Sequence, residues 1–223
     1  LHSWLKITMK ICRILSVFLL TGRMVSLMLT PQAYALPALE IKAKAAVLVD
    51  ADEGRIIFGQ NEQEREYPAS ITKIMTALLT LEAVGRGELD LNDVITMDDA
   101  ALADLTPDSS TAGLQAGEEI TVRNLLYCLL LASANEAANA LAIAVAGDIP
   151  TFVEQMNQRA QELGMSGTHF VNPHGLHSDG HYTTARDIFK MAKQAMTHAT
   201  FREIVSTGTY TVPATNLSGE RTL

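Results

Sequence analysis

The stretch Tyr67–Leu81, Tyr-Pro-Ala-Ser-Ile-Thr-Lys-Ile-Met-Thr-Ala-Leu-Leu-Thr-Leu, decides how the rest of the chain is interpreted. Pro68 ends the extended segment before it, and the residues from Ser70 onward have the composition of a helix. Lys73 is the single charge between Ser70 and Leu81, so this helix is expected to lie buried inside a domain. Burial of an ammonium group lowers its pKa, because the charged form loses its hydration.

Ser70 and Lys73 are three residues apart, so their side chains share one face of the predicted helix. A serine at the positive end of a helix, beside a lysine that can be neutral, is a nucleophile beside a base. The alternative is structural: Ser70 caps the helix, and Lys73 extends to the surface. Ser-x-x-Lys is common by chance, and taken alone it favours this structural alternative.

The first 35 residues have the organisation of a secretory signal sequence. Three basic residues precede the apolar run Ile14–Leu20, and Ala33-Tyr34-Ala35 places small residues where a signal peptidase cleaves. Arg23 interrupts the apolar run before it reaches the ~20 residues needed to span a membrane. Cleavage after Ala35 is therefore favoured over a retained anchor, and we predict an exported protein.

The composition of the remaining chain limits its partners. Loss of the leader removes four of the 17 basic residues and none of the 25 acidic residues, which leaves a formal charge of −12. An acidic, exported protein is a poor candidate for binding nucleic acid. Cys12 leaves with the leader, and Cys128 lies alone in an apolar run, so it is predicted to be a small buried residue without a disulfide.

Patterns along the body of the chain predict strands at both ends and helices between them. Ala45–Asp50 and Arg55–Gly59 flank a turn and predict a β-hairpin, and Tyr210–Pro213 predicts the beginning of another strand. Besides the helix from Ser70, apolar or amphipathic periodicity predicts helices at 121–132, 136–146, 152–163 and 184–195. This order indicates an α/β or α+β fold.

Ser133-Ala134-Asn135 interrupts two apolar helices and is the second segment that could carry chemistry. By itself it is an ordinary helix connection capped by polar residues. Together with Ser-x-x-Lys, this segment indicates a catalytic role, because the Ser133 hydroxyl could relay a proton between a lysine amine and a leaving group. The Asn135 amide could hold a substrate carbonyl and the lysine.

These two motifs, Ser70-Ile71-Thr72-Lys73 and Ser133-Ala134-Asn135, resemble the Ser-x-x-Lys and Ser-x-Asn motifs of penicillin-recognising serine enzymes. Together with their surroundings they resemble the serine-type D-Ala-D-Ala carboxypeptidases, the low-molecular-weight penicillin-binding proteins of peptidase family S11. The surrounding segments that carry this resemblance are Ala46–Asp50 with Gly54, Pro68–Thr76, Gly117-Glu118 with Leu125-Leu126, and Asn172–Leu176.

The resemblance implies a β-lactamase/transpeptidase-like α/β (α+β) fold, with an antiparallel sheet flanked by helices and a helical subdomain. It implies acyl transfer without a cofactor or metal, in which Lys73 takes the proton of Ser70 and Ser70 attacks a peptidoglycan stem peptide ending in D-Ala-D-Ala. Ser133 would pass a proton to the leaving D-Ala, and Asn135 would bind the substrate. β-Lactams would be inhibitors, and the site of action would be the extracytoplasmic face of the bacterial membrane or the cell wall.

One motif of the resembled family is missing. Lys-Thr-Gly, which the family carries on a strand beside the nucleophile, occurs nowhere in the chain, and Ser206-Thr207-Gly208 does not replace it. We therefore expect residues 1–35 to be a signal peptide and 36–223 to be a catalytic domain that is incomplete at its C-terminus and inactive as it stands. Membrane association would depend on the family's C-terminal segment, which would also be missing.

Three alternatives remain open. His174, His177 and His181 have a spacing that could suit zinc, although no pattern of acidic partners accompanies them. A class A β-lactamase shares the first two motifs, but it requires a glutamate followed by Leu and Asn, whereas Glu162 is followed by Leu and Gly. A non-catalytic domain that binds penicillin or senses the cell wall is the third alternative.

Overall fold

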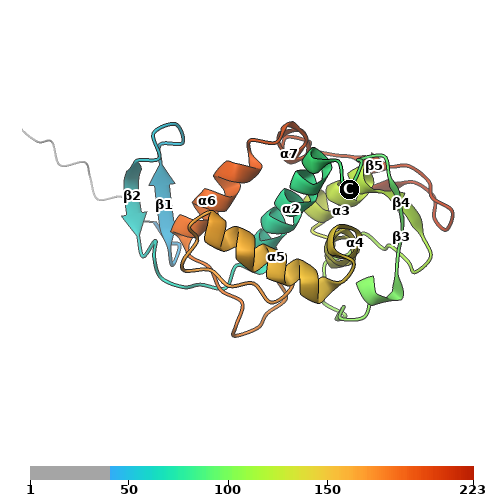
Figure 1. Cartoon of the computed structure of the whole chain (residues 1–223), viewed down its shortest axis with the longest axis horizontal. Coiled ribbons are helices and arrows are strands. Elements are labelled where there is room, and N and C mark those ends of the chain that lie inside the picture. Colours follow the sequence, from blue (N-terminus) through green and yellow to red (C-terminus); the bar gives the residue numbers. More distant parts are fainter. Residues whose placement is uncertain (1–40) are drawn as a thin grey trace, which may run out of the picture. The chain divides into compact units, whose positions relative to one another are not determined.

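A computed structural model describes residues 41–223, and the predicted signal peptide at 1–35 lies outside the described residues. Ala43–Leu223 fold as one unit, and the description below concerns this unit alone. Figure 1 shows the helix that follows Ser70 running through the middle of the unit, with other helices around it.

The described helices and strands follow the predicted order, with several short additions. The helical elements are η1 (Ala69–Thr72), α2 (Lys73–Arg86), η2 (Asp99–Ala101), α3 (Val122–Leu131), α4 (Asn135–Ala146), α5 (Ile149–Glu162), α6 (Ala185–Ala195) and α7 (Ala199–Val205). The strands are β1 (Ala46–Val49), β2 (Ile56–Gln60), β3 (Val94–Thr96), β4 (Glu119–Thr121), β5 (Thr211–Val212) and β6 (Arg221–Thr222).

Polar caps set the beginnings of three helices. Thr121 Oγ1 accepts a hydrogen bond from the Asn124 N–H at 3.2 Å, and so begins α3. Asp148 and Thr184 cap α5 and α6 in the same way. Each cap satisfies a backbone N–H that would otherwise lack a partner in the first turn, so these boundaries follow from local chemistry.

The core surrounds α2, which packs against α3, α4, α5, α6 and α7. One cluster of buried side chains includes Ala77 and Leu81 of α2 with Cys128 of α3, and a second includes Met75 and Leu78 of α2 with residues of α5 and α6. Because α2 and α4 bury residues in both clusters, they connect the two halves of the core. This explains why the predicted buried helix has so little polar surface.

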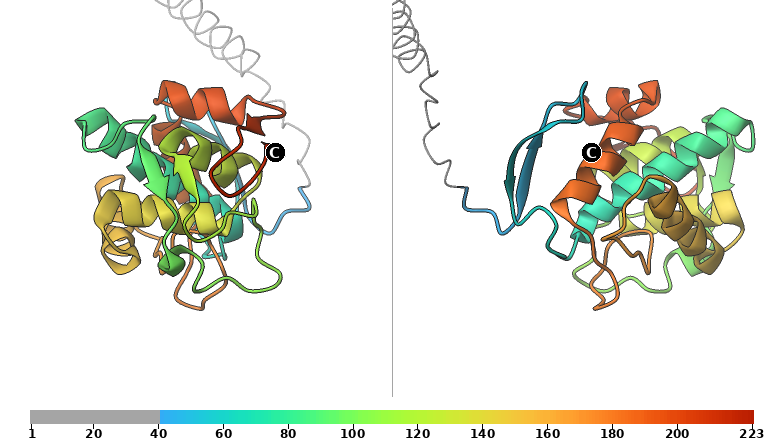
Figure 2. Two further views of the ribbon diagram at one scale, coloured as in Figure 1. Left: turned by 90° about the vertical axis from the view of Figure 1, so that its right-hand side faces the viewer. Right: turned by 60° about the vertical axis from the view of Figure 1, so that its left-hand side comes forward.

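The antiparallel strand pairing was predicted, but its division into separate sheets was not. Within residues 41–223, β1 pairs with β2, β3 with β4, and β5 with β6, as three two-stranded antiparallel sheets. The β1–β2 hairpin lies beside α6, and Figure 2 shows the two elements next to each other. The β3–β4 and β5–β6 pairs lie against the cluster that contains Cys128, through Ile120 and Val212.

Candidate active site

Residues from two separate segments, 70–73 and 133–135, meet at the N-terminal end of α2. Ser70 is exposed on the 3-10 turn η1, and Lys73 follows it as the first residue of α2. Ser133 lies in the connection between α3 and α4, and its hydroxyl donates to Ser70 Oγ at 2.9 Å. Asn135 begins α4, and its Oδ1 accepts from Lys73 Nζ at 2.8 Å. The structure therefore brings together all four residues that the two motifs singled out.

Lys73 is buried, with 2% of its surface exposed, but its amine is well provided with polar neighbours. Besides Asn135, the backbone carbonyl of His174 accepts from Nζ at 2.8 Å, and Ser70 Oγ lies 3.4 Å from Nζ. Burial lowers the pKa of Lys73 from 10.5 to about 8, and the charge of Glu136 opposes this change. At pH 7 the neutral fraction of the amine is then about one in ten, instead of about one in three thousand for an ordinary lysine.

The contacts of the amine leave one direction free for Ser70. A neutral amine has two N–H groups and one lone pair, and the two short contacts to Asn135 and His174 can take both N–H groups. The lone pair is then left for the Ser70 hydroxyl, whose oxygen is the third and longest contact. This arrangement can remove a proton from Ser70.

Ser133 has a backbone conformation that its sequence did not reveal. Its φ is +56°, in the left-handed region that residues with a side chain seldom occupy, at a cost of about 1–2 kcal/mol. The surrounding backbone holds it there: the Ala134 N–H donates to the Cys128 carbonyl at 3.0 Å, and the Asn135 N–H donates to the Ser110 carbonyl at 2.9 Å. Such strain is common at functional sites, and here it directs the hydroxyl toward Ser70.

A loop at residues 172–177 completes the site, although its sequence had indicated only the S11 resemblance and a possible zinc site. Asn172 stabilises this loop, since its Oδ1 accepts from the Gly175 N–H at 2.6 Å and its amide donates to the Leu176 carbonyl at 2.9 Å. Thr76 of α2 donates to the Pro173 carbonyl at 2.6 Å. The Asn-Pro-His-Gly-Leu resemblance indicated that this segment matters, but nothing in it showed that a backbone carbonyl would contact Lys73.

The three histidines considered for zinc have separate protein partners. The His174 ring lies 2.8 Å from Asp104, the His181 ring lies 2.7 Å from Thr72, and His177 is exposed beside Tyr67. Residues 41–223 contain no group of three or more His, Cys, Asp or Glu side chains that could hold a metal ion.

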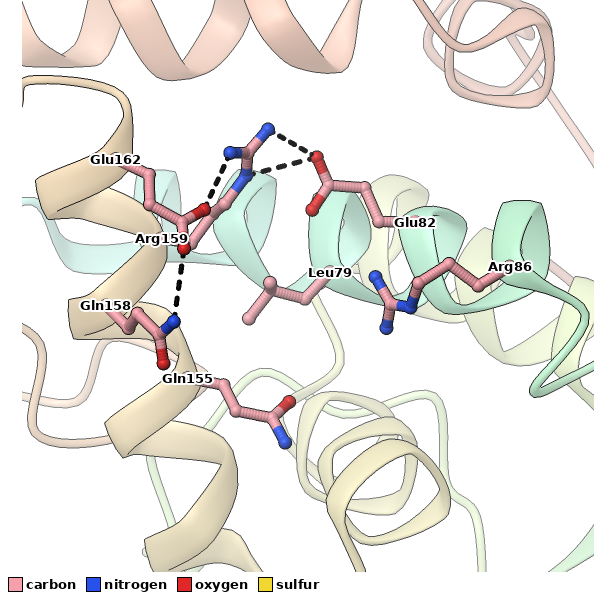
Figure 3. Close-up of a pocket in the computed structure, with 7 residues that line it drawn as sticks. All are labelled: Leu79, Glu82, Arg86, Gln155, Gln158, Arg159 and Glu162. Carbon is pink, nitrogen blue, oxygen red and sulfur yellow. Dashed lines mark hydrogen bonds and ion pairs between the residues drawn. The ribbon is translucent and has the colours of Figure 1, made fainter.

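Glu162, the residue considered for a β-lactamase, lies at the opposite end of the central helix. Figure 3 shows it at a hollow between α2 and α5, where Arg159 joins it to Glu82. Arg159 donates to Glu162 at 2.8 Å and to Glu82 at 2.8 Å. Since Glu82 follows Lys73 by nine residues on one helix, the backbone of Glu82 lies about 13 Å along α2 from that of Lys73.

Comparison with known proteins identifies the family. A family model for the S11 peptidases, D-alanyl-D-alanine carboxypeptidases, matches residues 31–217. The chain belongs to this family. D-alanyl-D-alanine carboxypeptidase DacF of Bacillus subtilis is 39% identical over 169 residues, which cover 76% of this chain and 42% of the relative. DacA of Haemophilus influenzae is 36% identical over 149 residues and 38% of its length, so the chain spans about two fifths of these S11 relatives.

Solved structures confirm the predicted β-lactamase/transpeptidase-like fold. Penicillin-binding protein 5 of Haemophilus influenzae has a TM-score of 0.76 and 32% identity, covering 79% of this chain and 52% of that one. The Streptomyces K15 DD-transpeptidase has a TM-score of 0.75 and 32% identity, covering 84% of this chain and 74% of that one. The S11 resemblance drawn from the motifs is thereby confirmed.

No single helix of residues 41–223 is long and apolar enough to cross a membrane, and only α4 and α5 taken together, across a bend of 85°, reach the required length and composition.

Proposed function

We propose that this S11 protein is a serine-type D-Ala-D-Ala carboxypeptidase that removes the terminal D-Ala from peptidoglycan stem peptides. The proposal rests on one observation above all: Lys73 Nζ is buried, held by two carbonyl-type oxygens at 2.8 Å, and faces Ser70 Oγ with its remaining position. The S11 relatives named as D-alanyl-D-alanine carboxypeptidases supply the substrate class.

In the proposed mechanism, the neutral amine of Lys73 accepts the Ser70 proton while Ser70 Oγ attacks the penultimate D-Ala carbonyl carbon. The tetrahedral adduct collapses as the C–N bond breaks, and the proton taken by Lys73 passes through the Ser133 hydroxyl to the leaving D-Ala nitrogen. An ester to Ser70 remains. Water then attacks this ester and gives a proton to Lys73. The bond between Ser70 Oγ and the acyl carbon breaks, Lys73 returns the proton to Ser70 Oγ, and the shortened peptide leaves. In this proposal Asn135 keeps the amine in place through Oδ1, and its amide binds the substrate carbonyl.

The proposed function also implies a class of inhibitors and a cellular location. β-Lactams would acylate Ser70, since they offer a strained amide to the same nucleophile. Residues 1–35 would be a signal peptide that directs residues 36–223, the catalytic domain, to the extracytoplasmic side of the membrane. Substrate carboxylate binding and part of the oxyanion hole are assigned by resemblance to the Lys-Thr-Gly strand, which this sequence does not contain.

The test is covalent labelling by a penicillin, read by intact-mass spectrometry. We expect one adduct on Ser70 in a version that extends beyond residue 223 through a Lys-Thr-Gly strand, and much slower labelling of residues 36–223 alone, by ~10²–10³ for a lost oxyanion donor. Ser70→Ala should remove the adduct. Ser206→Ala, which changes a serine at the end of α7, should not affect it.

Labelling that survives Ser70→Ala would exclude Ser70 as the nucleophile. If the extended version carries no adduct but cleaves a D-Ala-D-Ala peptide only when zinc is supplied, the family's serine mechanism does not operate here. If residues 36–223 label as fast as the extended version, another segment of this chain performs the work of Lys-Thr-Gly.

A further inference from the structure

A chain of hydrogen bonds runs from the Lys73 amine through two further residues and returns to α4. The His174 carbonyl accepts from Lys73 Nζ at 2.8 Å, and the buried His174 ring contacts Asp104 Oδ2 through Nε2 at 2.8 Å. The other carboxylate oxygen of Asp104 accepts from Asn139 Nδ2 at 2.8 Å. Asn135 and Asn139 lie about one turn apart, so α4 holds the amine directly and also through this chain.

The contacts of the His174 ring define its tautomer and orientation. The Leu176 N–H donates to Nδ1 at 3.1 Å, so Nδ1 is an acceptor and Nε2 carries the proton that is donated to Asp104. Burial lowers the pKa of His174, although Asp104 opposes this, and the ring is therefore neutral at neutral pH. Rotation of the ring would lose both hydrogen bonds at once.

The orientation of the ring matters because the His174 carbonyl lies outside any helix or strand. This carbonyl belongs to the peptide unit that leads into Gly175, whose φ is +93°. Regular secondary structure does not hold this peptide unit. Asn172 Oδ1 anchors its Gly175 N–H side at 2.6 Å, and the His174 ring is the anchor on the other side. Asp104 is the anchor for the ring, and 46% of its side chain is exposed at the edge of the site.

We propose that Asp104 and His174 act as one positioning unit for Lys73. Asp104 fixes the His174 ring, the ring fixes the His174 carbonyl, and the carbonyl takes one N–H of the amine so that the lone pair faces Ser70. In this scheme Asp104 and His174 act through Lys73 and transfer no proton themselves. The inference depends on the proposed acyl transfer for its catalytic consequence, but the hydrogen-bond unit itself can be tested without turnover.

The experiment is a double-mutant cycle of Asp104→Leu and His174→Leu in the version that extends through a Lys-Thr-Gly strand, with penicillin acylation followed over pH. Each single variant should lower the high-pH plateau of the acylation rate by about 10-fold or more. The double variant should be no slower than the slower single variant, because the two residues act as a unit. His174→Gln keeps an N–H donor near the Nε2 position and should recover most of the rate.

The control is Asp108→Leu, which changes an exposed carboxylate on the same loop and should leave the rate unchanged. Thermal melting checks that each variant folds. Asp104→Ser and His174→Phe replace the leucine variants if those do not fold. Additive losses in the double variant, or wild-type rates in the single variants, would overturn the proposal.

A second readout separates positioning from a general loosening of the site. The Lys73 titration is followed by NMR of carbon-labelled lysine in the chain itself. If the variants only loosen the packing, water enters and the pKa of Lys73 rises from about 8 toward 10.5. Positioning predicts a pKa at or below about 8 in each variant, since the charged amine loses a well-placed acceptor while its burial is kept.

Failure of the proposed function has a different signature, because the wild-type protein would then not react with penicillin at all. In that case the Lys73 titration alone decides the inference. Equal downward shifts in both single variants and in the double variant support one positioning unit, and a rise or additive shifts overturn it.

Discussion

Replacement of Gly175 by alanine should destabilise the protein strongly, because the backbone at Gly175 lies directly against the backbone of the η1 turn at Ala69. A Cβ at Gly175 would lie 1.9 Å from the Ala69 carbonyl oxygen, and the φ of Gly175 is +93°. The left-handed conformation costs about 1–2 kcal/mol in alanine. Relief of the collision adds about 1–3 kcal/mol. We expect the free energy of unfolding to fall by about 2–5 kcal/mol, measured by urea denaturation followed by circular dichroism.

Substitutions at two other glycines measure the backbone and collision contributions to this free-energy loss separately. Gly147 ends α4 with a φ of +85° and has open space where a Cβ would be, so Gly147→Ala should lose only about 1–2 kcal/mol. Gly85 lies inside α2, also with open space and without a positive φ, and Gly85→Ala should gain about 0.5–1 kcal/mol. If Gly175→Ala loses no more than Gly147→Ala, the close contact with Ala69 has no energetic weight and the reasoning is wrong.

Three further predictions concern charged and titrating groups. Lys73→Arg should abolish acylation of Ser70, because a guanidinium does not deprotonate at working pH. The acylation rate of the wild-type protein should rise as pH increases through about 8. An active arginine variant would mean that only positive charge is needed. Burial lowers the pKa of His181 from 6.5 to about 4, so the unfolded state binds a proton at a higher pH than the folded state does. The free energy of unfolding should therefore fall by about 3 kcal/mol as pH drops from 6.5 to about 4. His181→Gln should flatten this dependence in acid denaturation, while the exposed His177→Gln should leave it unchanged. Arg159→Gln should lower the free energy of unfolding in urea by about 1–2 kcal/mol, because it leaves the largely buried Glu82 without its partner (Figure 3). Arg86→Gln changes an ion pair that is half exposed and should lower it by under about 0.5 kcal/mol. Equal losses in the two variants would contradict the role of burial.

The residues that converge at the site could be predicted from the sequence, because their chemistry lies in their side chains, which the sequence specifies. An isolated charge in an apolar segment indicated a buried Lys73, and a polar break between apolar helices indicated Ser133 and Asn135. The helix periods were strong enough to place α3 to α6 to within a few residues. The S11 resemblance then supplied the fold that the strand pattern alone left open between α/β and α+β.

Backbone features escaped prediction because they depend on tertiary contacts. The left-handed conformation of Ser133, the 3-10 turn under Ser70 and the carbonyl of His174 have no local sequence signal. The short strands β3 and β4 are three residues each, too short for a period-2 pattern, and their pairing joins residues about 25 positions apart. Asp104 gave no signal either, since its partners, His174 and Asn139, are 70 and 35 positions away.

The buried thiol of Cys128 provides a natural probe of how the site opens. Burial raises the pKa of this thiol to about 12, so alkylating reagents cannot modify it while α3 stays packed. The carbonyl of the same residue accepts from the Ala134 N–H and so belongs to the backbone that holds Ser133. Any fluctuation that exposes the thiol must therefore disturb the hydrogen bond between Ser133 and Ser70 as well. The rate at which Cys128 is alkylated would then report how often the resting protein loses its assembled site. A ligand that fills the site should lower that rate.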